Sequence, residues 1–399
     1  MVDCKEELAV YNISKKVFYV LFTIYAAASV IFSKAENEIF ANLSGLVLVA
    51  AFISYQLVYT SKTLYMNSML VVYFLFYLLC ILSLTWTIDT DYSSYTVIRM
   101  GMIFVNLVAL YNILKVFKVH EAIFSGFLIG MLVNFALATE LISIAYPIYT
   151  KGRFIGSTVH PNVIGIFALF AILGSILLLQ NAKNKLWIVI NLVNILGALY
   201  VITLAASRSA LLISIFIILL YVVQVFINPK TRIYLFVAIG ALFIMFVYFV
   251  DLAKLAEHVN FMMDRIAGIF GALGGRADSS TAERLLFVQI MMDVFKENPF
   301  WGTGVNTSRV FLHGFYTHNN YVEILGTLGI FGLLLYYSAY AHMIWKISLV
   351  KDFWIKYYLV AFSLVIIIFD FAAVTFYAKS TLMMLLVLHF MAEENRNVS

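Results

Sequence analysis

The amino-acid sequence predicts an all-α membrane protein that crosses the bilayer about twelve times. Of its 399 residues, 63% are hydrophobic and 12% are charged, and its mean hydropathy is +0.97. A soluble core could not hide so much apolar surface, so most of it must face lipid. The apolar runs are long and continuous, whereas a transmembrane β-barrel shows short strands of alternating hydrophobicity. These observations favour a bundle of membrane-spanning helices.

Twelve apolar segments approach the length of about 20 residues that a helical membrane span requires. The predicted spans are residues 17–33, 39–59, 67–87, 97–116, 120–146, 159–180, 186–206, 209–227, 232–251, 320–345, 355–377 and 380–392. Lys15 and Lys16 precede the first segment, but no small-residue cleavage pattern follows it. We therefore interpret this segment as a retained helix and not as a signal peptide.

The basic residues in the connecting loops favour a cytoplasmic location for both termini. On the predicted cytoplasmic side stand Lys62, Lys115, Lys118, Lys183, Lys185, Lys230, Arg232, Lys346, Lys351 and Lys356. The short loops on the opposite side contain little positive charge beyond Lys34, Lys151, Arg153, Arg208 and Lys379. This asymmetry follows the positive-inside rule. It places the one long loop, residues 252–317, outside the cytoplasm and away from ATP and nucleotide sugars.

The chain is predicted to form a single membrane domain, because it has no internal repeat, low-complexity tract or linker. Helices 1–9 occupy residues 1–251, the extracytoplasmic loop residues 252–317, and helices 10–12 residues 318–399. Within the loop, Ser280 and Glu283 form the capping box expected at a helix start. Leu285, Val288, Met292 and Phe295 then recur on one face. This pattern is typical of an amphipathic helix at the membrane interface.

The composition gives no indication of several other kinds of site. The two cysteines, Cys4 and Cys80, would lie in different environments, so neither a disulfide nor a metal site is predicted. Asp89 and Asp91 form a carboxylate pair that is more typical of a surface turn than of a metal site. Membrane topology explains most of the net charge of +5. We therefore expect no metal, no cofactor and no nucleic-acid partner.

Four arginines on the predicted outer side are candidates for binding an anion. They are Arg99, Arg153, Arg208 and Arg284. Positive charge is disfavoured in short loops on this side, although each arginine could instead snorkel to lipid phosphates or pair with loop carboxylates. Arg208 is the strongest candidate, because it stands in a very short turn between two apolar helices. Its planar guanidinium can bind a phosphate or pyrophosphate through two parallel hydrogen bonds.

A polar segment at the start of the tenth predicted span contains His318, Asn319, Asn320 and Glu323. A histidine near its ordinary pKa can take a proton from a hydroxyl group at neutral pH. The alternative is a capped helix start, in which an asparagine satisfies backbone groups and His318 is solvated at the interface. The residues by themselves leave both interpretations open.

Two further patterns have structural explanations. His160 precedes Pro161, and proline suits the first turn of a helix. Gly326, Gly329 and Gly332 recur at three-residue intervals, which favours close helix packing over ligand binding.

In combination, several motifs resemble the superfamily of bacterial O-antigen ligases and O-antigen or capsular polysaccharide polymerases. The shared features are about twelve spans, a major outer loop between the ninth and tenth spans, and short motifs in a fixed order. The motifs are Trp-Thr-Ile-Asp at 86–89, Arg-Phe-Ile-Gly and His-Pro-Asn within 153–162, Ser-Arg-Ser-Ala-Leu-Leu at 207–212, Glu-Arg-Leu-Leu at 283–286, Asn-Pro-Phe-Trp-Gly-Thr-Gly at 298–304, and His-Asn at 318–319, separated by nine residues from Gly329. The resemblance covers nearly the whole chain.

The resemblance implies a GT-C-like, metal-independent and inverting glycosyltransferase in the bacterial cytoplasmic (inner) membrane, with its active site on the outer face. Its donor would be a glycan on undecaprenyl pyrophosphate, which arrives already activated. By their match to the family motifs, Arg208 and Arg284 would bind the donor pyrophosphate, and His318 would activate an acceptor hydroxyl. Arg153, Asn319 and His160 are further candidates for substrate binding.

The resemblance favours a polymerase that joins lipid-linked repeat units, because ligases often have threonine where this chain has Gly332. The near alternative is an O-antigen ligase, which transfers the glycan to lipid A-core. A flippase for lipid-linked sugars is a third reading, but transporters tend to show internal repeats and helices broken at the bilayer midplane. The expected partners are the lipid-linked donor, a lipid-linked acceptor or lipid A-core, and membrane lipids. A chain-length regulator and a flippase would act in the same process.

Overall fold

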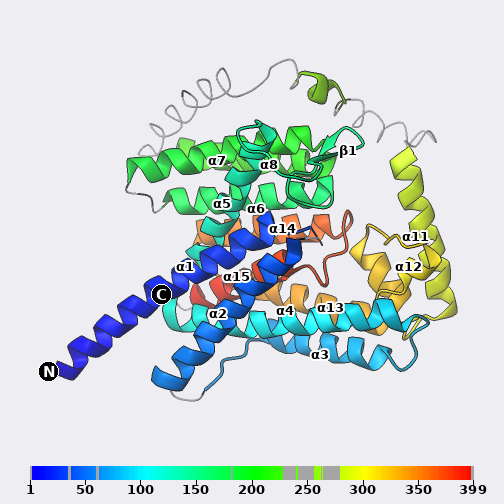
Figure 1. Cartoon of the computed structure of the whole chain (residues 1–399), viewed down its shortest axis with the longest axis horizontal. Helices are drawn as coiled ribbons and strands as arrows, with labels where there is room; N and C mark the ends of the chain where they lie inside the picture. The colour runs from blue at the N-terminus through cyan, green and yellow to red at the C-terminus, as the bar shows by residue number, and fades with distance from the viewer. Residues whose placement is uncertain are drawn as a thin grey trace. The chain divides into compact units, whose positions relative to one another are not determined.

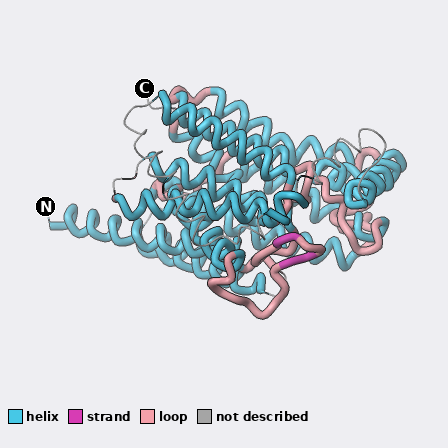
Figure 2. The backbone as a smooth tube through the Cα atoms, turned by 90° about the horizontal axis from the view of Figure 1, so that it is seen from above, coloured by secondary structure: helices cyan, strands magenta, loops and turns pink. Residues whose placement is uncertain are grey.

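The computed structural model describes residues 2–34, 37–59, 63–180, 182, 184–227, 240, 256–261, 263 and 279–396. Within these ranges the chain is helical apart from loops and one small hairpin of strands (Figure 2). Seven of the described helices are long and apolar enough to cross a membrane. This supports an all-α polytopic membrane protein, whereas the count of twelve spans stays a prediction. The ninth predicted span, 232–251, lies outside the described residues.

Each of the two compact units of the chain combines segments that are distant in sequence. Unit 1 comprises Met1–Ser44 and His120–Gly271, and unit 2 comprises Gly45–Val119 and Ala272–Ser399. The boundaries of the single membrane domain proposed from the sequence stay a prediction.

Unit 1 is a group of apolar helices with one hairpin. Its elements are α1 (Val2–Ile31), α5 (Glu121–Ala138), β1 (Tyr149–Thr150), β2 (Arg153–Phe154), α6 (Pro161–Gln180), α7 (Lys185–Leu204) and α8 (Arg208–Ile227). Helix α1 packs along α5, and α5, α6 and α7 pack against one another. Gly126 of α5 lies against Ala26 and the Thr23 carbonyl of α1, so no side chain could be accommodated at position 126 without a shift.

Unit 2 surrounds the long helix α13. Its elements are most of α2 (Glu38–Tyr59), together with α3 (Ser68–Ser83), α4 (Thr90–Phe117), α11 (Ser279–Glu297), α12 (Ser308–Phe311), α13 (Asn320–Ser348), α14 (Phe353–Phe369) and α15 (Lys379–Glu394). Helix α3 packs against both α4 and α13, and the three run side by side in Figure 1. Helix α15 contacts α4, α13 and α14. These contacts place the first turns of α13 among several elements of the same unit.

The C-terminal end of α15 is held by charged groups of α4 and α13. Glu394 forms ion pairs with Lys118 at 2.6 Å and with Lys115 at 3.3 Å. Glu393 forms an ion pair with Lys346 and accepts a hydrogen bond from the Tyr111 hydroxyl at 2.8 Å. By the predicted topology this end is cytoplasmic.

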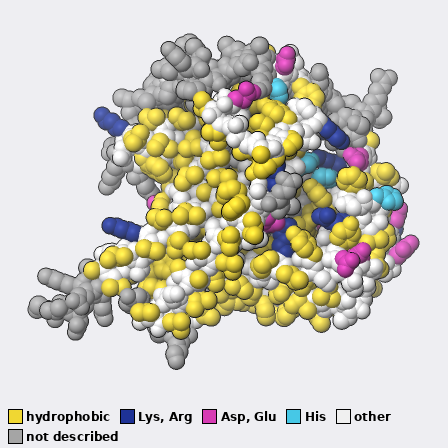
Figure 3. Space-filling model, viewed as in Figure 1, with side chains coloured by type: hydrophobic (Ala, Val, Ile, Leu, Met, Phe, Trp, Pro, Cys, Tyr) yellow, Lys and Arg dark blue, Asp and Glu magenta, His cyan; other side chains and the backbone are white. Residues whose placement is uncertain are grey.

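The outer surface has the apolar character expected of a protein in contact with lipid. Hydrophobic side chains cover much of the described surface in Figure 3, where charged side chains are sparse. In α2, Leu57 is 81% exposed and Val58 is 68% exposed. Such exposure of large apolar side chains is costly in water and favourable in a bilayer.

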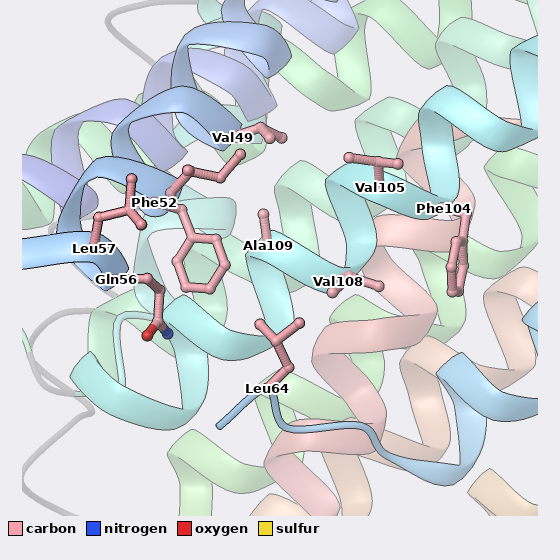
Figure 4. A pocket seen from close by; sticks show the side chains of 10 residues that line it. Val49, Phe52, Gln56, Leu57, Leu64, Phe104, Val105, Val108 and Ala109 are labelled. Atoms are coloured by element: carbon pink, nitrogen blue, oxygen red, sulfur yellow. The ribbon is translucent and has the colours of Figure 1, made fainter. Parts of the chain in front are cut away.

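An apolar cavity of about 440 Å³ lies between α2 and α4 of unit 2. In Figure 4, Val49 and Phe52 of α2 face Ala109 of α4, and Gln56 is the one polar side chain of the lining. Without charged or nucleophilic groups in its wall, this cavity has no chemistry suited to catalysis, so the candidate site must be sought elsewhere.

Helices occupy the positions of the predicted spans outside 232–251, but several end earlier than the sequence predicts. Helix α3 ends at Ser83 instead of residue 87, α5 at Ala138 instead of residue 146, and α14 at Phe369 instead of residue 377. After α14 the apolar run continues past the helix because loop side chains are also buried. Phe376, for example, is fully buried beyond the end of α14.

The predicted amphipathic helix of the long loop is found as α11, Ser279–Glu297. Its buried side is formed by Phe287, Met291 and Val294, whereas Leu285 of the predicted apolar face is 58% exposed. Helix α11 packs on α13, where Met291 lies against Gly326. The close packing predicted at Gly326 is confirmed, and the location of α11 at a membrane interface stays a prediction.

Candidate functional site

The polar segment before α13 is a capped helix start, as one of the two sequence interpretations predicts, but His318 is half-buried and not simply solvated as that interpretation expects. The Oδ1 atom of Asn319 accepts hydrogen bonds from the backbone N–H groups of Tyr321 and Val322, at 3.0 and 3.2 Å. These are two of the backbone donors that a helix start leaves unsatisfied. The side chain of Asn319 therefore positions the segment, and its role in substrate binding stays a prediction.

Glu323 fixes the same segment from inside the first turn of α13. Its carboxylate is fully buried and accepts hydrogen bonds from the Thr317 N–H at 3.1 Å, the Thr317 hydroxyl at 2.9 Å and the Ser308 hydroxyl at 2.5 Å. A buried carboxylate is tolerated only with such partners. Glu323 thereby joins α12, the turn before α13, and α13 itself.

His318 stands between the two residues that these hydrogen bonds hold. Its φ angle is 55°, a left-handed conformation that is uncommon for residues other than glycine. Its ring lies 4.2 Å from that of Tyr316, centroid to centroid. Burial and, secondarily, the positive charge of Arg284 lower the pKa of His318 to about 4. The imidazole is therefore neutral at physiological pH, and it is a weaker base than an exposed histidine.

Arg284 belongs to the same site. It is a half-buried residue of α11, and its charge acts on both His318 and Tyr316. Within unit 2, the structure thus brings together the predicted base and one of the two predicted pyrophosphate ligands.

Two more arginines of unit 2 lie over tyrosine rings. The guanidinium carbon of Arg309, in α12, is 5.6 Å from the ring centroid of Tyr92, and that of Arg99, in α4, is 5.4 Å from the ring centroid of Tyr377. The sequence pattern singled out Arg99 but missed Arg309. No spacing signal marks Arg309, because it lies in a helix of only four residues that follows a glycine-containing loop.

The motif at 298–304 supports the site by docking on a break in α13. At Gly329 the helix adopts φ 67° and ψ −167°, and a side chain there would collide with the backbone of Phe300. Across the break, the Ile330 N–H donates to the Pro299 carbonyl at 2.8 Å, and the Gly304 N–H donates to the Thr327 carbonyl at 2.8 Å. The sequence predicts close helix packing at Gly329; the close approach is present, but its partner is a loop and the helix is broken there, so the prediction of helix packing is wrong at this position.

A second network ties the loop after α14 to the start of α13. Asn320 accepts hydrogen bonds from the backbone of Thr375 and Phe376, at 2.8 and 3.1 Å. The fully buried Asp370 accepts hydrogen bonds from the hydroxyls of Tyr337, at 2.8 Å, and Thr375. The segment that holds His318 is thus braced from two sides.

Arg208 lies in unit 1, as the first residue of α8. The turn before it consists of Ala205, Ala206 and Ser207, which confirms the short connection predicted from the sequence. Arg153 is buried beside this turn and donates hydrogen bonds to the carbonyls of Ala205 and Ala206, at 2.9 and 3.2 Å. Arg153 therefore shapes the turn that presents Arg208. Its contact with substrate stays a prediction.

His160 also has a structural contact in unit 1. Its Nδ1 atom accepts a hydrogen bond from the Asn162 N–H at 3.1 Å, and Pro161 is the first residue of α6, as predicted. The imidazole caps the start of this helix, and its role in substrate binding stays a prediction.

The predicted pair of carboxylates is a helix cap. Asp89 accepts hydrogen bonds from the N–H groups of Asp91 and Tyr92, both at 3.0 Å, at the start of α4. Among the described residues, no group of histidine, cysteine and acidic side chains has the arrangement of a metal site.

The predicted substrate-binding residues divide between the two units. His318, Asn319 and Arg284 belong to unit 2, whereas Arg208, Arg153 and His160 belong to unit 1.

Comparison with known proteins gives one family. Residues 192–337 match the family model described as O-antigen ligase, while no curated protein matches the chain. The matched range contains Arg208, Arg284 and His318 and leaves out Arg153 and His160. This partial match supports the resemblance to the O-antigen ligase and polymerase superfamily that the motifs carry.

Proposed function

We propose that this protein is a membrane glycosyltransferase that polymerises undecaprenyl-pyrophosphate-linked repeat units into O-antigen or capsular polysaccharide. The observation that carries the proposal is the braced turn at 317–319. It holds a neutral histidine beside an arginine, within the range matched by the O-antigen ligase family. Such a pair can take a proton from an acceptor and bind an anionic leaving group.

The proposed reaction is an inverting displacement. An acceptor hydroxyl oxygen attacks the anomeric carbon of the donor, the new glycosidic bond forms, and the bond to pyrophosphate breaks. The electron pair of that bond leaves with the pyrophosphate, and the hydroxyl proton passes to His318. Because the imidazole is uncharged before the reaction, it has a lone pair to receive this proton.

Arg208 and Arg284 are the proposed ligands of the donor pyrophosphate. Negative charge grows on the leaving group as the bond breaks, and fixed guanidinium groups stabilise it without reorganisation of solvent. Arg208, at the N-terminus of α8, suits this task, because helix N-termini also favour anions. The rate gains further from holding donor and acceptor side by side.

The reaction is proposed to take place on the outer face of the bacterial cytoplasmic membrane, with both termini in the cytoplasm. Lys115, Lys118 and Lys346 at one end of the unit 2 helices, opposite the His318 end, support this orientation. A flippase would deliver the lipid-linked repeat units, and a chain-length regulator would act on the same polymer.

An O-antigen ligase is the second candidate, favoured by the description of the matching family model. The two activities differ in the acceptor, so products distinguish them. Purified protein should be incubated with lipid-linked repeat units, with and without lipid A-core. Polymer formed without lipid A-core would establish the polymerase. Transfer only to lipid A-core would establish the ligase, and the absence of any new glycosidic bond would favour a flippase.

A further inference from the structure

The side chain of Arg309 has a hydrogen-bond donor for which the described residues provide no acceptor. Its Nε atom is buried and has no hydrogen-bond partner among the described residues. A buried charged donor without a partner costs free energy, so an unfilled position of this kind points to a ligand. The neighbouring carboxylate of Glu323 is already engaged by Ser308 and Thr317.

The guanidinium of Arg309 is held by aromatic contact. It lies over the ring of Tyr92, and its charge acts on the side chain of Tyr377. A guanidinium that stacks on a ring keeps its N–H donors at its edge, in one plane. That edge matches two oxygens of a phosphate group.

Arg99 adds a second guanidinium near the same point. It lies over the ring of Tyr377, and the charges of Arg99 and Arg309 both act on that tyrosine. Arg99 is the tenth residue of α4. A charged side chain within an apolar membrane span is costly, which favours a functional role for it. The two arginines come from different elements and converge on Tyr377.

The site lies beside the proposed base. Arg309 and Arg284 both act electrostatically on Tyr316, whose ring contacts that of His318. An anion bound by Arg309 would therefore stand near the reacting atoms, where the diphosphate of the donor is needed.

We propose that Arg309 and Arg99 form a further oxyanion site in unit 2, which binds phosphate oxygens of the polyprenyl diphosphate. The inference rests on the proposed function, which supplies the ligand. It adds two residues from α12 and α4 to the two arginines indicated by the family motifs. Arg309 is then a group that binds the leaving diphosphate and not only a neighbour of Glu323.

The test measures binding separately from glycosyl transfer. Full-length protein in nanodiscs is titrated with radiolabelled geranylgeranyl diphosphate, and inorganic pyrophosphate serves as competitor. The variants are Arg309→Gln and Arg309→Lys. Arg396→Gln is the matched control, because Arg396 also lies over an aromatic ring, that of Trp345, at 5.7 Å. Elution as a monodisperse species shows that each variant is folded.

The proposal predicts that Arg309→Gln weakens diphosphate binding by about tenfold or more. Arg309→Lys should weaken it less, since one of two hydrogen bonds can remain, and Arg396→Gln should bind like the wild type. Equal binding by wild type and Arg309→Gln would overturn the oxyanion site alone. If the wild type binds no diphosphate, both the oxyanion site and the proposed polyprenyl-diphosphate-linked donor are wrong.

A phospholipid headgroup could supply the same phosphate chemistry. The titration is therefore repeated in nanodiscs of phosphatidylcholine alone and with added phosphatidylglycerol. The oxyanion site predicts that the loss in Arg309→Gln is the same in neutral nanodiscs. A loss seen only with phosphatidylglycerol would assign Arg309 to phospholipid and contradict the proposal.

Discussion

The carboxylate of Glu323 holds Thr317 through both its backbone N–H and its hydroxyl, at 3.1 and 2.9 Å. Thr317 directly precedes His318, and its hydroxyl also accepts a hydrogen bond from the Asn319 N–H at 3.2 Å. The two neighbours of His318 are therefore fixed, and the backbone of His318 keeps its left-handed conformation. Glu323 acts on the reaction through the placement of the imidazole.

Replacement of Glu323 by glutamine should lower turnover while leaving donor affinity nearly unchanged. An amide cannot accept all three hydrogen bonds, so the turn at 317–319 loosens and His318 is displaced. A misplacement of this kind can cost roughly tenfold to hundredfold in rate. Steady-state kinetics with purified lipid-linked donor would separate kcat from KM. Glu323→Asp should recover part of the rate. A rise in KM with unchanged kcat would contradict a positioning role.

The activity should persist to unusually low pH for a reaction that uses histidine as a base. Burial lowers the pKa of His318 to about 4, so the neutral form that accepts a proton is lost only as the pH falls through that value. The pH profile of kcat/KM reports the pKa of the free enzyme. An acidic limb near pH 6.5 would show that His318 titrates like an unburied histidine, or that another group is the base.

Arg284 should set part of this pH dependence. Its positive charge disfavours protonation of His318, so Arg284→Gln should move the acidic limb of kcat/KM toward higher pH. The maximal value of kcat/KM would also fall if Arg284 binds pyrophosphate. Only the pH position of the acidic limb measures the effect of the Arg284 charge on the pKa of His318. A matched control is Lys296→Gln, which removes an exposed cation from the same helix. An unmoved limb in Arg284→Gln would show that the two groups are not electrostatically coupled.

Replacement of Gly329 by alanine should destabilise unit 2. The break in α13 needs a positive φ, and the new Cβ would meet the backbone of Phe300. Strained backbone of this kind costs about 1–3 kcal/mol, so the thermal midpoint in detergent should fall. Gly314→Ala is the control, because Gly314 also has a positive φ, 91°, but nothing lies within 4 Å of its added Cβ. An equal fall in the thermal midpoint of both variants would show that the positive φ angle accounts for the whole cost, and that the clash with the loop at Phe300 contributes nothing.

Arg153→Ala should lower stability by about 1–3 kcal/mol, since two carbonyls at the end of α7 lose a charged donor. Thermal unfolding measures this loss, and Lys151→Gln, an exposed neighbour in the same hairpin, should be nearly neutral. The fraction of Arg153→Ala that remains folded should bind donor less well, because no guanidinium then holds the carbonyls of Ala205 and Ala206 in the turn before Arg208. Unchanged stability with lost binding would instead make Arg153 a direct ligand.

The sequence could predict much of the local structure at the site. Proline at the start of α6, the asparagine cap of α13 and the close packing at Gly326 each follow from the intrinsic preference of a residue type. The membrane class follows from composition, and the placement of α11 from its capping pattern and apolar spacing. Such features depend on neighbours a few residues apart.

Features that depend on distant segments were not predictable. The break of α13 at Gly329 interrupts a pattern that remains apolar throughout, because the loop at 298–304 supplies the missing hydrogen-bond partners. Arg309 stacks on the ring of Tyr92, which lies about two hundred residues earlier in the chain, so the sequence near Arg309 does not reveal this contact. The hairpin of β1 and β2 places Lys151 and Gly152 at positive φ, and the polar sequence around it reads equally well as a loop.

In the proposed reaction, His318 takes the proton of the acceptor hydroxyl. The most direct measurement is the turnover of purified full-length His318→Ala with lipid-linked repeat units. His313→Ala is the matched control, because His313 is an exposed histidine of the same loop with a similar φ of 52°. If His318 is the base, His318→Ala should still bind donor but lose roughly a hundredfold or more in turnover, while His313→Ala should keep the wild-type rate. Wild-type turnover by His318→Ala would contradict this role.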